Sequence, residues 1–483
     1  MQELNKTVAQ KTERPVKVLQ FGEGNFLRAF VDWILQEAND KELINTNVAV
    51  VQPIEMGRVK DLEKQDGLYT VFLEGIKNKE VVSQKQVIDV LDDFINPYTE
   101  YDQYLAYAKS EELRYIISNT TEAGIILDKE DTKLDTCPNS FPGKLLALLV
   151  ERYKYFDGDK NKGLIILPCE LIDHNGKELK KVMNELAGLV GLEEDFITWL
   201  NEANTFCSTL VDRIVTGYPR NEIEKVTKEL GYVDNSVVKC EIFHLWVIET
   251  QDPKVKEEFP VDKAGLDVIF VDDLTPYKQR KVSILNGSHT AMVPVGYLYG
   301  IDTVRETVED EVMGQFVKDV MFNEIIPTQD LPKDELDKFA DEVLDRFKNP
   351  YIYHELLAIS LNSTTKYKTR ILPTVIKYLD RKNELPKRLL FSLASMLVFF
   401  KGERNGEKIP VNDNKEFLDM YEALWGSYDG STESVDKIVK QFLGLKDHWE
   451  FDFAKYPEVE KFVSESVYSI VNDGMKAAIK KVM

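Results

Sequence analysis

The stretch Val16-Lys-Val-Leu-Gln-Phe-Gly22-Glu-Gly24-Asn-Phe-Leu-Arg-Ala29 predicts a strand, a glycine turn and a helix in immediate succession. The two glycines allow the backbone to turn tightly and to approach a pyrophosphate, which then rests on the N–H groups at the start of the helix. Leu27 stands where a third glycine is usual. The stretch therefore predicts a dinucleotide-binding turn, with an ordinary tight turn as the alternative.

Further apolar runs place this turn in a larger sheet. Strands are predicted at Thr46–Gln52, Tyr115–Ser118 and Leu164–Leu167, with a helix at Lys144–Tyr155 between the last two. Strands that alternate with helices indicate a mainly parallel sheet. The sequence thus predicts an α/β fold with a Rossmann-like nucleotide-binding domain, and the segment 201–249 is expected to add a layer to its sheet.

Polar loops follow the predicted strands, at Asn119–Gly124 and at Pro168–Gly176. Ligands of such folds bind beyond the carboxyl ends of the strands, so both loops are candidate walls of a site. Gln52 closes the second strand, where an acidic residue normally binds the ribose of NAD. Glu55 could accept the ribose hydroxyls instead, whereas Arg58 could meet the 2′-phosphate of NADP, and these residues favour NAD.

The composition of the 483 residues excludes several classes of partner. With 43% hydrophobic and 10% aromatic residues, the chain can bury sizeable cores. Its 61 basic and 83 acidic residues give a formal net charge of −22, which argues against nucleic acid and anionic membranes. An anionic substrate would therefore need a local basic cluster. The segment Asn362–Pro373, with Lys366, Lys368 and Arg370, could supply one.

The cysteines and the N-terminus carry no signal for metal, disulfide or export. The four cysteines are far apart, with no paired spacing typical of zinc sites, so free thiols and no metal are expected. The N-terminal residues are polar, and no stretch holds 18 uncharged apolar residues. A cytoplasmic protein without membrane association is predicted.

A second stretch, Lys281-Val-Ser-Ile-Leu-Asn286-Gly-Ser-His289, combines an amine, a carboxamide and an imidazole. In an α-helix Asn286 would lie about 140° and His289 about 80° round from Lys281, on one broad face. A lysine with a lowered pKa can protonate a developing alkoxide, and an amide N–H can stabilise its charge. The spacing fits carbonyl reduction without a metal, although such residues also occur together by chance.

The sequence beyond His289 is strongly helical. Apolar residues at three- and four-residue spacing predict helices at Glu309–Phe322, Lys333–Phe347, Arg388–Phe400 and Ser434–Leu443. We expect a polar leader at residues 1–14, a nucleotide-binding domain with additions at 15–276, and a helical substrate and catalytic domain at 277–483.

Several stretches together resemble one family, the polyol-specific long-chain dehydrogenases and reductases to which mannitol dehydrogenase belongs. The Lys281, Asn286 and His289 spacing is similar to the family signature K-x4-N-x2-H, and Gly22-x-Gly24-x-Phe26-x-Arg28-Ala29 is similar to its nucleotide fingerprint. The resemblance extends from about Val16 to Pro373. It implies NAD(H) as cofactor, Lys281 as acid/base, Asn286 as oxyanion donor and His289 as ligand of a substrate hydroxyl.

The same resemblance implies a set of nucleotide contacts around the glycine turn. These cofactor-binding residues are Val18, Leu19, Gln20, Phe21, Gly22, Glu23, Gly24, Asn25, Phe26, Leu27, Arg28, Ala29 and Thr121. Mannitol-type members carry an asparagine before their H-N-G motif where this chain has Glu170-Leu171-Ile172. The corresponding asparagine is therefore either missing or supplied by Asn175, which is the substrate-binding residue expected here.

Longer motifs, such as Ser118–Gly124 and Thr216-Gly-Tyr-Pro-Arg220, resemble those of one branch of this family, whose members reduce D-tagaturonate to D-altronate with NADH. Lys366 and Arg370 are expected to bind the carboxylate of such a hexuronate. The alternatives are D-fructuronate or another polyol as substrate, and a non-catalytic NAD-binding sensor. The partner expected is a small-molecule hexuronate or aldonate, and the protein a monomer or small homo-oligomer.

Overall fold

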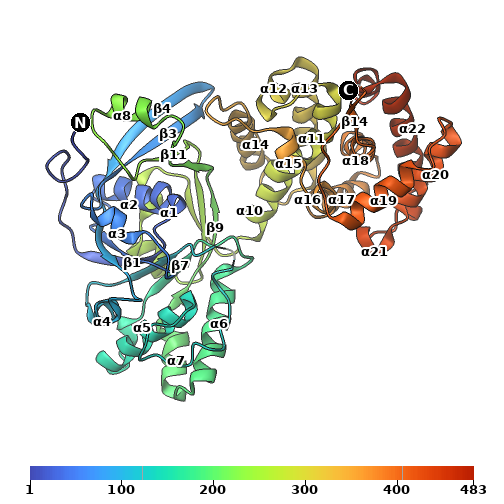
Figure 1. Ribbon diagram of the computed structural model, residues 1–483. Helices are drawn as coiled ribbons and strands as arrows, with labels where there is room; N and C mark the ends of the chain where they lie inside the picture. Colours follow the sequence, from blue (N-terminus) through green and yellow to red (C-terminus); the bar gives the residue numbers. More distant parts are fainter. Residues whose placement is uncertain (122, 405) are drawn as a thin grey trace. The chain divides into compact units, whose positions relative to one another are not determined.

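The protein divides into two compact units in the computed structural model, which describes residues 1–121, 123–404 and 406–483 (Figure 1). The sheet unit comprises Met1–Gly75 and Val81–Leu274, and the helical unit comprises Ile76–Glu80 and Thr275–Met483. Glu122, within the predicted loop Asn119–Gly124, lies outside the described residues.

A six-stranded parallel sheet forms the centre of the sheet unit. Its strands, in spatial order, are β5 (Leu91–Ile95), β2 (Asn47–Val51), β1 (Val16–Phe21), β6 (Tyr115–Ser118), β7 (Ile165–Pro168) and β8 (Thr205–Phe206). The strand order reverses on either side of β1, which creates the crevice where such folds bind dinucleotides. The prediction of a Rossmann-like α/β fold is confirmed.

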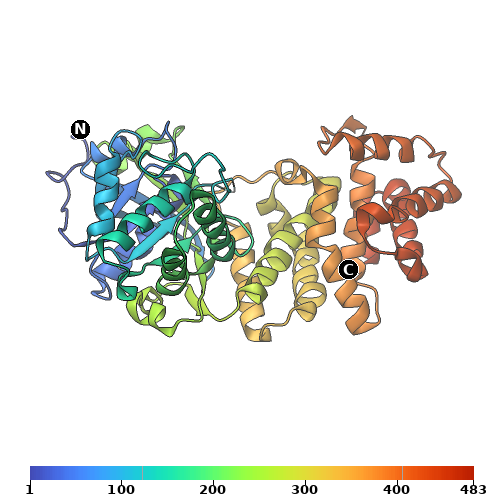
Figure 2. The same cartoon turned by 90° about the horizontal axis from the view of Figure 1, so that it is seen from below.

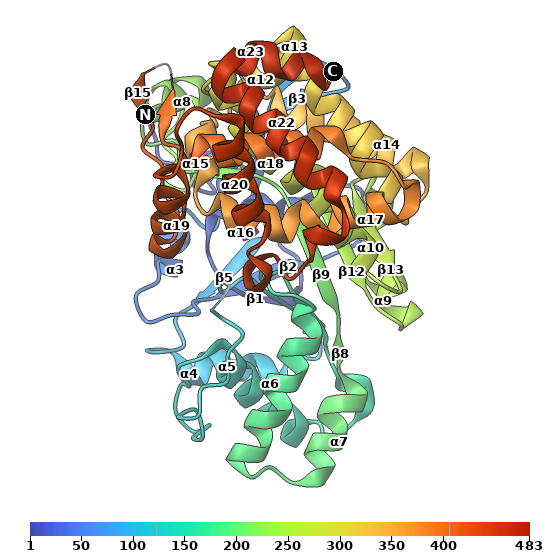
Figure 3. The ribbon, with the colours of Figure 1, turned by 90° about the vertical axis from the view of Figure 1, so that its right-hand side faces the viewer.

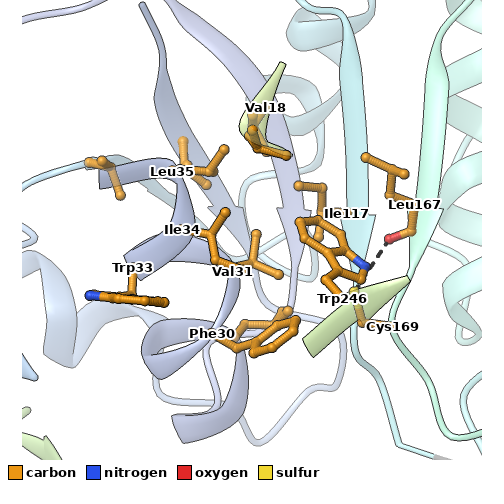
Figure 4. Close-up of a cluster of buried hydrophobic side chains, with 14 of the residues drawn as sticks. Val18, Phe30, Val31, Trp33, Ile34, Leu35, Ile117, Leu167, Cys169 and Trp246 are labelled. Atoms are coloured by element: carbon orange, nitrogen blue, oxygen red, sulfur yellow. Dashed lines mark hydrogen bonds between the residues drawn. The ribbon is translucent and has the colours of Figure 1, made fainter. Parts of the chain in front are cut away.

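Both faces of this sheet are buried, which explains why its strands are apolar throughout. Successive side chains of β1 point to opposite faces: Val18 packs with Phe30 and Ile34 in one core, and Leu19 belongs to the other. The first core is covered by α1 (Asn25–Ala29) and α2 (Val31–Asp40) and includes Trp246 (Figure 4). The second is covered by α5 (Phe141–Tyr155), α6 (Asn175–Val190) and α7 (Glu194–Ala203), which lie in front of the strands in Figure 2.

The extra layer expected from segment 201–249 is present: β8 joins the central sheet, and the rest of the segment contributes to two further sheets, from which Val211 and Trp246 pack in the first core. One sheet contains β10 (Val215–Gly217), β11 (Val238–Glu241), β3 (Tyr69–Lys77) and β4 (Glu80–Ile88); the other contains β13 (Val268–Val271), β12 (Leu245–Glu249) and β9 (Ser208–Asp212). The remaining helices of the unit are α3 (Val59–Glu63), α4 (Tyr101–Ala106), α8 (Ile223–Leu230) and α9 (Pro253–Glu258), with 3-10 turns at Tyr107–Lys109, Lys160–Lys162 and Val261–Ala264.

The N-terminal segment, predicted as a polar leader, runs along the sheet unit. Leu4 is fully buried, and its backbone N–H donates to the carbonyl oxygen of Val233 at 2.8 Å. Arg14 forms an ion pair with Asp89 at 2.8 Å. Both contacts attach the segment to the same unit as the nucleotide-binding sheet.

Helices make up most of the helical unit. They are α10 (Thr275–Arg280), η4 (Lys281–Gly287), α11 (Ser288–Tyr299), α12 (Val304–Glu309), α13 (Glu311–Asp319), η5 (Val320–Ile325), η6 (Ile326–Thr328), α14 (Lys333–Phe347), α15 (Leu356–Ser360), α16 (Ser363–Arg370), α17 (Leu372–Lys382), α18 (Lys387–Phe399), α19 (Lys415–Trp425), α20 (Thr432–Leu443), α21 (Lys446–Trp449), η7 (Phe453–Lys455), α22 (Pro457–Asp473), α23 (Met475–Ala478) and η8 (Ile479–Lys481). Two short strands, β14 (Glu403–Arg404) and β15 (Glu407–Lys408), pair antiparallel.

Three of the four predicted helices are present within two residues at each end, as α14, α18 and α20. The fourth, at Glu309–Phe322, is divided because Asp310 has extended backbone angles and caps a new helix. Its carboxylate accepts from the N–H groups of Val312 and Met313. α22 lies against α18 and α20 (Figure 3). No helix among the described residues is long and apolar enough to span a membrane.

Candidate active site

The glycine turn lies at the carboxyl end of β1, between β2 and β6. The N–H of Gly22 donates to the carbonyl oxygen of Val51 at 3.1 Å. Gly22 has φ +126°, and a Cβ at this position would lie 3.0 Å from the carbonyl oxygen of Asn119. Only glycine satisfies both conditions. At Gly24 no atom lies within 4 Å of a hypothetical Cβ, so the backbone is open to a ligand. This open backbone fits the close approach of a pyrophosphate.

The residues of the predicted nucleotide stretch divide into a buried framework and an accessible turn. Glu23 and Phe26 are half-buried, and Gly24 and Asn25 are exposed. The framework consists of Val18, Leu19, Gln20, Phe21, Leu27 and Ala29, which are exposed by 1% or less. These side chains hold the strand and helix in place, and the accessible turn carries the surface that a nucleotide can reach.

Arg28 is buried beside the framework rather than exposed on the accessible turn. Its side chain is buried and donates to the carbonyl oxygens of Glu23 and Ser236 and to Oδ1 of Asn25. The guanidinium also lies over the ring of Tyr69, 5.2 Å from its centroid. Burial lowers the pKa of Arg28, and the nearby Tyr69 and Asp234 counteract this effect. The buried Arg28 side chain therefore stabilises the turn through its hydrogen bonds to Glu23 and Asn25.

Asp32 is a buried carboxyl group beneath the turn that sequence analysis did not single out. Its Oδ2 lies 3.2 Å from the hydroxyl of Tyr69 and 3.4 Å from Nε2 of Gln20, which also donates to the carbonyl oxygen of Gly22 at 3.1 Å. Oδ1 of Asp32 and Oε1 of Gln20 are buried without a hydrogen-bond partner. Burial raises the pKa of Asp32 to about 7, although its hydrogen bonds to Gln20 and Tyr69 act in the opposite direction.

The loop after β6 carries Thr121, which the resemblance placed at the cofactor. Its backbone has φ +77°, unusual for a β-branched residue. Glu170, after β7, holds the start of this loop, because it accepts from the hydroxyl of Ser118 at 3.0 Å and from the N–H and hydroxyl of Thr120 at 2.9 Å each. Glu170 is buried, and its positioning role depends on a pairing between loops that no local sequence pattern predicts.

Asn175 does not have the free amide that its predicted substrate-binding role requires. It is fully buried, and its Nδ2 lies 2.9 Å from the carbonyl oxygen of Pro168, 3.0 Å from that of Glu170 and 3.1 Å from that of Thr209. Its Oδ1 accepts from the N–H groups of Gly176 and Thr209. The expectation is corrected accordingly: Asn175 joins the loop after β7 to β9.

Lys281 and Asn286 lie on a π-helix, η4, rather than on an α-helix, in which they would be about 140° apart around the axis. Because a π-helix pairs residues five apart, Asn286 lies about one turn beyond Lys281 on the same face. The wide turn thus brings the amine and the amide closer in direction than the 140° of an α-helix. Both residues are half-buried. Wide turns of this kind are often found at functional sites.

His289 follows on α11, and its imidazole is packed between two rings. It stacks on Phe347 with the ring centroids 4.2 Å apart and meets the edge of His354 at 5.3 Å. Its Nε2 is buried without a hydrogen-bond partner. Burial lowers the pKa of His289 far below its ordinary value, and the charges of His354, Arg346, Arg370 and Lys366 lower it further. The neutral ring can therefore exchange a hydrogen bond with a substrate hydroxyl.

The predicted basic segment lies on α16, next to the lysine–asparagine turn. The carbonyl oxygen of Arg370 would lie 3.3 Å from a Cβ at Gly287, and Nη1 of Arg370 lies 3.5 Å from the hydroxyl of Thr290. Nζ of Lys366 donates to the carbonyl oxygen of Ile359 at 2.8 Å. Burial lowers the pKa of both basic groups, and Arg370 lowers that of Lys366 further.

Lys368 differs from its two neighbours. Its Nζ forms an ion pair with Oε1 of Glu450 at 2.8 Å, on the exposed surface. The structure therefore separates the three basic residues of the predicted cluster into two that lie near His289 and one that is neutralised elsewhere. His354 and Arg346, which sequence analysis did not identify, complete the charged surroundings of His289.

Metal-binding side chains do not gather in the described part of the chain: no group of three or more His, Cys, Asp or Glu residues is placed to hold an ion. The four cysteines are free thiols; Cys169, Cys207 and Cys240 are buried, and Cys137 is half-buried.

The sheet unit carries an accessible glycine turn on a Rossmann-like sheet, and the helical unit carries a lysine, an amide and an imidazole; both features are typical of nucleotide-dependent oxidoreductases. The family model of the mannitol dehydrogenase Rossmann domain matches residues 16–262, and that of the mannitol dehydrogenase C-terminal domain matches residues 273–471. The chain belongs to the mannitol dehydrogenase family. It is an NAD-dependent oxidoreductase.

Relatives that match over the full length of the chain share a more specific name than the family models give. The chain is 47% identical to a protein named altronate oxidoreductase from Phocaeicola vulgatus, with 100% of both chains covered, and 46% identical to one of the same name from Pectobacterium carotovorum, with 99% of each covered. Among solved structures, D-sorbitol dehydrogenase in substrate-free form has a TM-score of 0.83, and Pseudomonas fluorescens mannitol 2-dehydrogenase in complex with NAD and D-mannitol has 0.68. Each is 22% identical, and the matches cover 99% of this chain and 99–100% of theirs, which shows a shared fold.

Proposed function

We propose that the protein interconverts D-tagaturonate and D-altronate, with NADH as the reductant of the keto group. The observation that carries this proposal is the position of Arg370 and Lys366 beside His289. In a protein with a net charge of −22, two partly desolvated cations next to a catalytic segment suit a substrate with its own negative charge. A sugar acid has such a charge, and a neutral polyol does not.

In this proposal the helical unit supplies the proton and the stabilising groups. Bound NADH supplies a hydride to the carbonyl carbon. As the C–O π bond breaks, Lys281 donates a proton to the oxygen and becomes neutral, and it takes the proton back in the reverse reaction. The amide N–H of Asn286 stabilises the negative charge that develops on the oxygen before the proton arrives. Lys281 and Asn286 can both donate to the same substrate oxygen because they share a face of η4.

His289 binds a neighbouring hydroxyl in this arrangement. Its buried Nε2 lacks a protein partner, so a substrate hydroxyl would satisfy it. Arg370 then binds the carboxylate, because a guanidinium can form two parallel hydrogen bonds with it, and Lys366 adds a second positive charge. Asn175 has no part in this assignment, because its amide is fully used within the sheet unit.

The experiment that tests the proposal is NADH oxidation, followed by absorbance in the presence of a chelator, with D-tagaturonate, D-fructuronate and D-fructose in parallel. Preference for D-tagaturonate is expected. Preference for D-fructuronate would support the same mechanism with a different substrate. Preference for D-fructose would contradict the assignment of Arg370 to a substrate carboxylate. Binding of NADH without turnover of any substrate would favour the sensor.

A further inference from the structure

The loop after β2 has an unusual arrangement for a strand end that faces a dinucleotide. Gln52 ends this strand region, where many NAD-binding folds carry an acidic residue for the ribose hydroxyls. Its side chain is buried, and its Nε2 donates to the carbonyl oxygens of Ile54 at 2.9 Å and Glu55 at 3.0 Å. Its Oε1 lies 3.4 Å from the N–H of Val59. Gln52 is thus neutral and holds the loop, so it leaves no carboxylate for a ribose.

A carboxylate reaches this loop from the glycine turn instead. Oε1 of Glu23, which lies between the two glycines, accepts from the backbone N–H of Arg58 at 2.9 Å. The approach is close, because a Cβ at Gly57 would lie 2.6 Å from the same oxygen and 2.3 Å from Cγ of Gln52. Glu23 therefore spans from the turn after β1 to the loop after β2, and its side chain is only half-buried.

We propose that Glu23 binds the hydroxyls of the adenosine ribose and thereby selects NAD over NADP. A carboxylate has lone pairs for two hydroxyl groups in addition to the backbone N–H that it already accepts. The same negative charge repels the 2′-phosphate of NADP. Glu23 takes the place of the acidic residue that is missing at Gln52. The role concerns the cofactor alone and is independent of the sugar substrate.

The two other charged residues of the loop are less suited to this role. The guanidinium of Arg58 forms an ion pair with Asp61 at 2.8 Å, and its side chain is 79% exposed. It is therefore directed to a partner in its own helix rather than held for a phosphate. Glu55 is exposed, and only its carbonyl oxygen is tied to Gln52. Glu55 provides a matched control, because it is the same residue type in the same loop.

The test is calorimetric titration of the full-length protein with ADP-ribose and with 2′-phospho-ADP-ribose, which report binding without turnover. The wild type is expected to bind ADP-ribose at least about 100-fold more tightly than the phosphorylated ligand. In Glu23→Gln, loss of the charge-assisted hydrogen bonds should weaken ADP-ribose binding about 10-fold, and the preference should fall below about 3-fold. Glu55→Gln should retain the wild-type ratio.

An unchanged ratio in Glu23→Gln, or a lost preference in Glu55→Gln, would overturn the proposal. Thermal unfolding of each variant checks that the turn still folds. If Glu23→Gln is unstable, Glu23→Asp provides a second test, because the shorter carboxylate should bind ADP-ribose more weakly and still exclude the 2′-phosphate. The ratio of KM values for NADPH and NADH should change in parallel with the binding ratio.

Discussion

The imidazole of His289 stacks on the ring of Phe347, with the centroids 4.2 Å apart and the planes inclined by 28°. This packing shields part of the half-buried imidazole from water, and burial is the largest cause of its lowered pKa. His289 should therefore stay neutral from about pH 8 down to pH 5.5. NMR of labelled histidines, assigned with His289→Gln, should show one ring with neutral shifts throughout this range.

The same measurement in Arg370→Gln tests the cationic surroundings. Because the positive charge of Arg370 lowers the pKa of His289, its removal should raise that pKa. Titration of the wild-type ring near pH 6.5 would contradict a buried neutral imidazole and its proposed hydrogen bond to a substrate hydroxyl.

Lys281→Ala should reduce kcat by about 10²- to 10⁴-fold, the usual contribution of a general acid or base. NADH binding should be retained, because the glycine turn belongs to the sheet unit. Stopped-flow turnover and fluorescence titration with NADH separate the two effects. Lys333→Ala, which removes an exposed lysine from α14, serves as the control. Equal losses of kcat in both variants would leave Lys281 without a catalytic role.

Arg370→Ala should raise the KM for D-tagaturonate about 10- to 100-fold, since a charge-assisted pair with the substrate carboxylate is lost. The KM for an uncharged ketose should change little. The matched control is Lys368→Ala on the same helix, because Lys368 is already paired with Glu450. If both variants, or both substrates, respond equally, the carboxylate is bound elsewhere.

Asp32→Asn should stabilise the protein above neutral pH. Burial raises the pKa of Asp32 from 3.8 to about 7, so the folded state binds the proton more tightly than the unfolded state. Stability from this group is therefore present below about pH 4 and is lost as the pH rises to 7. The shift corresponds to a loss of about 4 kcal/mol at higher pH, as an order of magnitude.

Calorimetry at pH 5, 7 and 8.5 measures this dependence. The variant should lose part of the decrease in unfolding free energy that the wild type shows between pH 5 and 8.5. Parallel curves for the two proteins would mean that Asp32 does not titrate in this range. Gln36→Ala, on the same helix but without a titratable group, should leave the slope unchanged.

The sequence was sufficient for β1, β2, β6 and β7 of the central sheet, because apolar runs such as Val16–Phe21 and the glycines after it have strong local signatures, but β5 and β8 were not predicted. It was also sufficient for helices with a clear apolar period, such as Lys333–Phe347. The sequence did not predict contacts that depend on packing between residues far apart in the chain. The pairing of Ser118 and Thr120 with Glu170 joins two loops that are far apart in the chain, and the hydrogen bonds of Asn175 depend on β9. The approach of His354 to His289 likewise depends on the fold of the helical unit.

The π-helix of Lys281–Gly287 changes how the interval between two residues should be interpreted. Conversion of this one turn to α-helix would rotate Lys281 by about 100° relative to the helix that follows, the angle of a single residue. The direction of the amine is thus set by one extra residue in the backbone, without any change in side chains. A deletion of one residue at this point would alter the register of the whole segment before it. Two residues that must act together at an interval of five therefore indicate a wide helical turn.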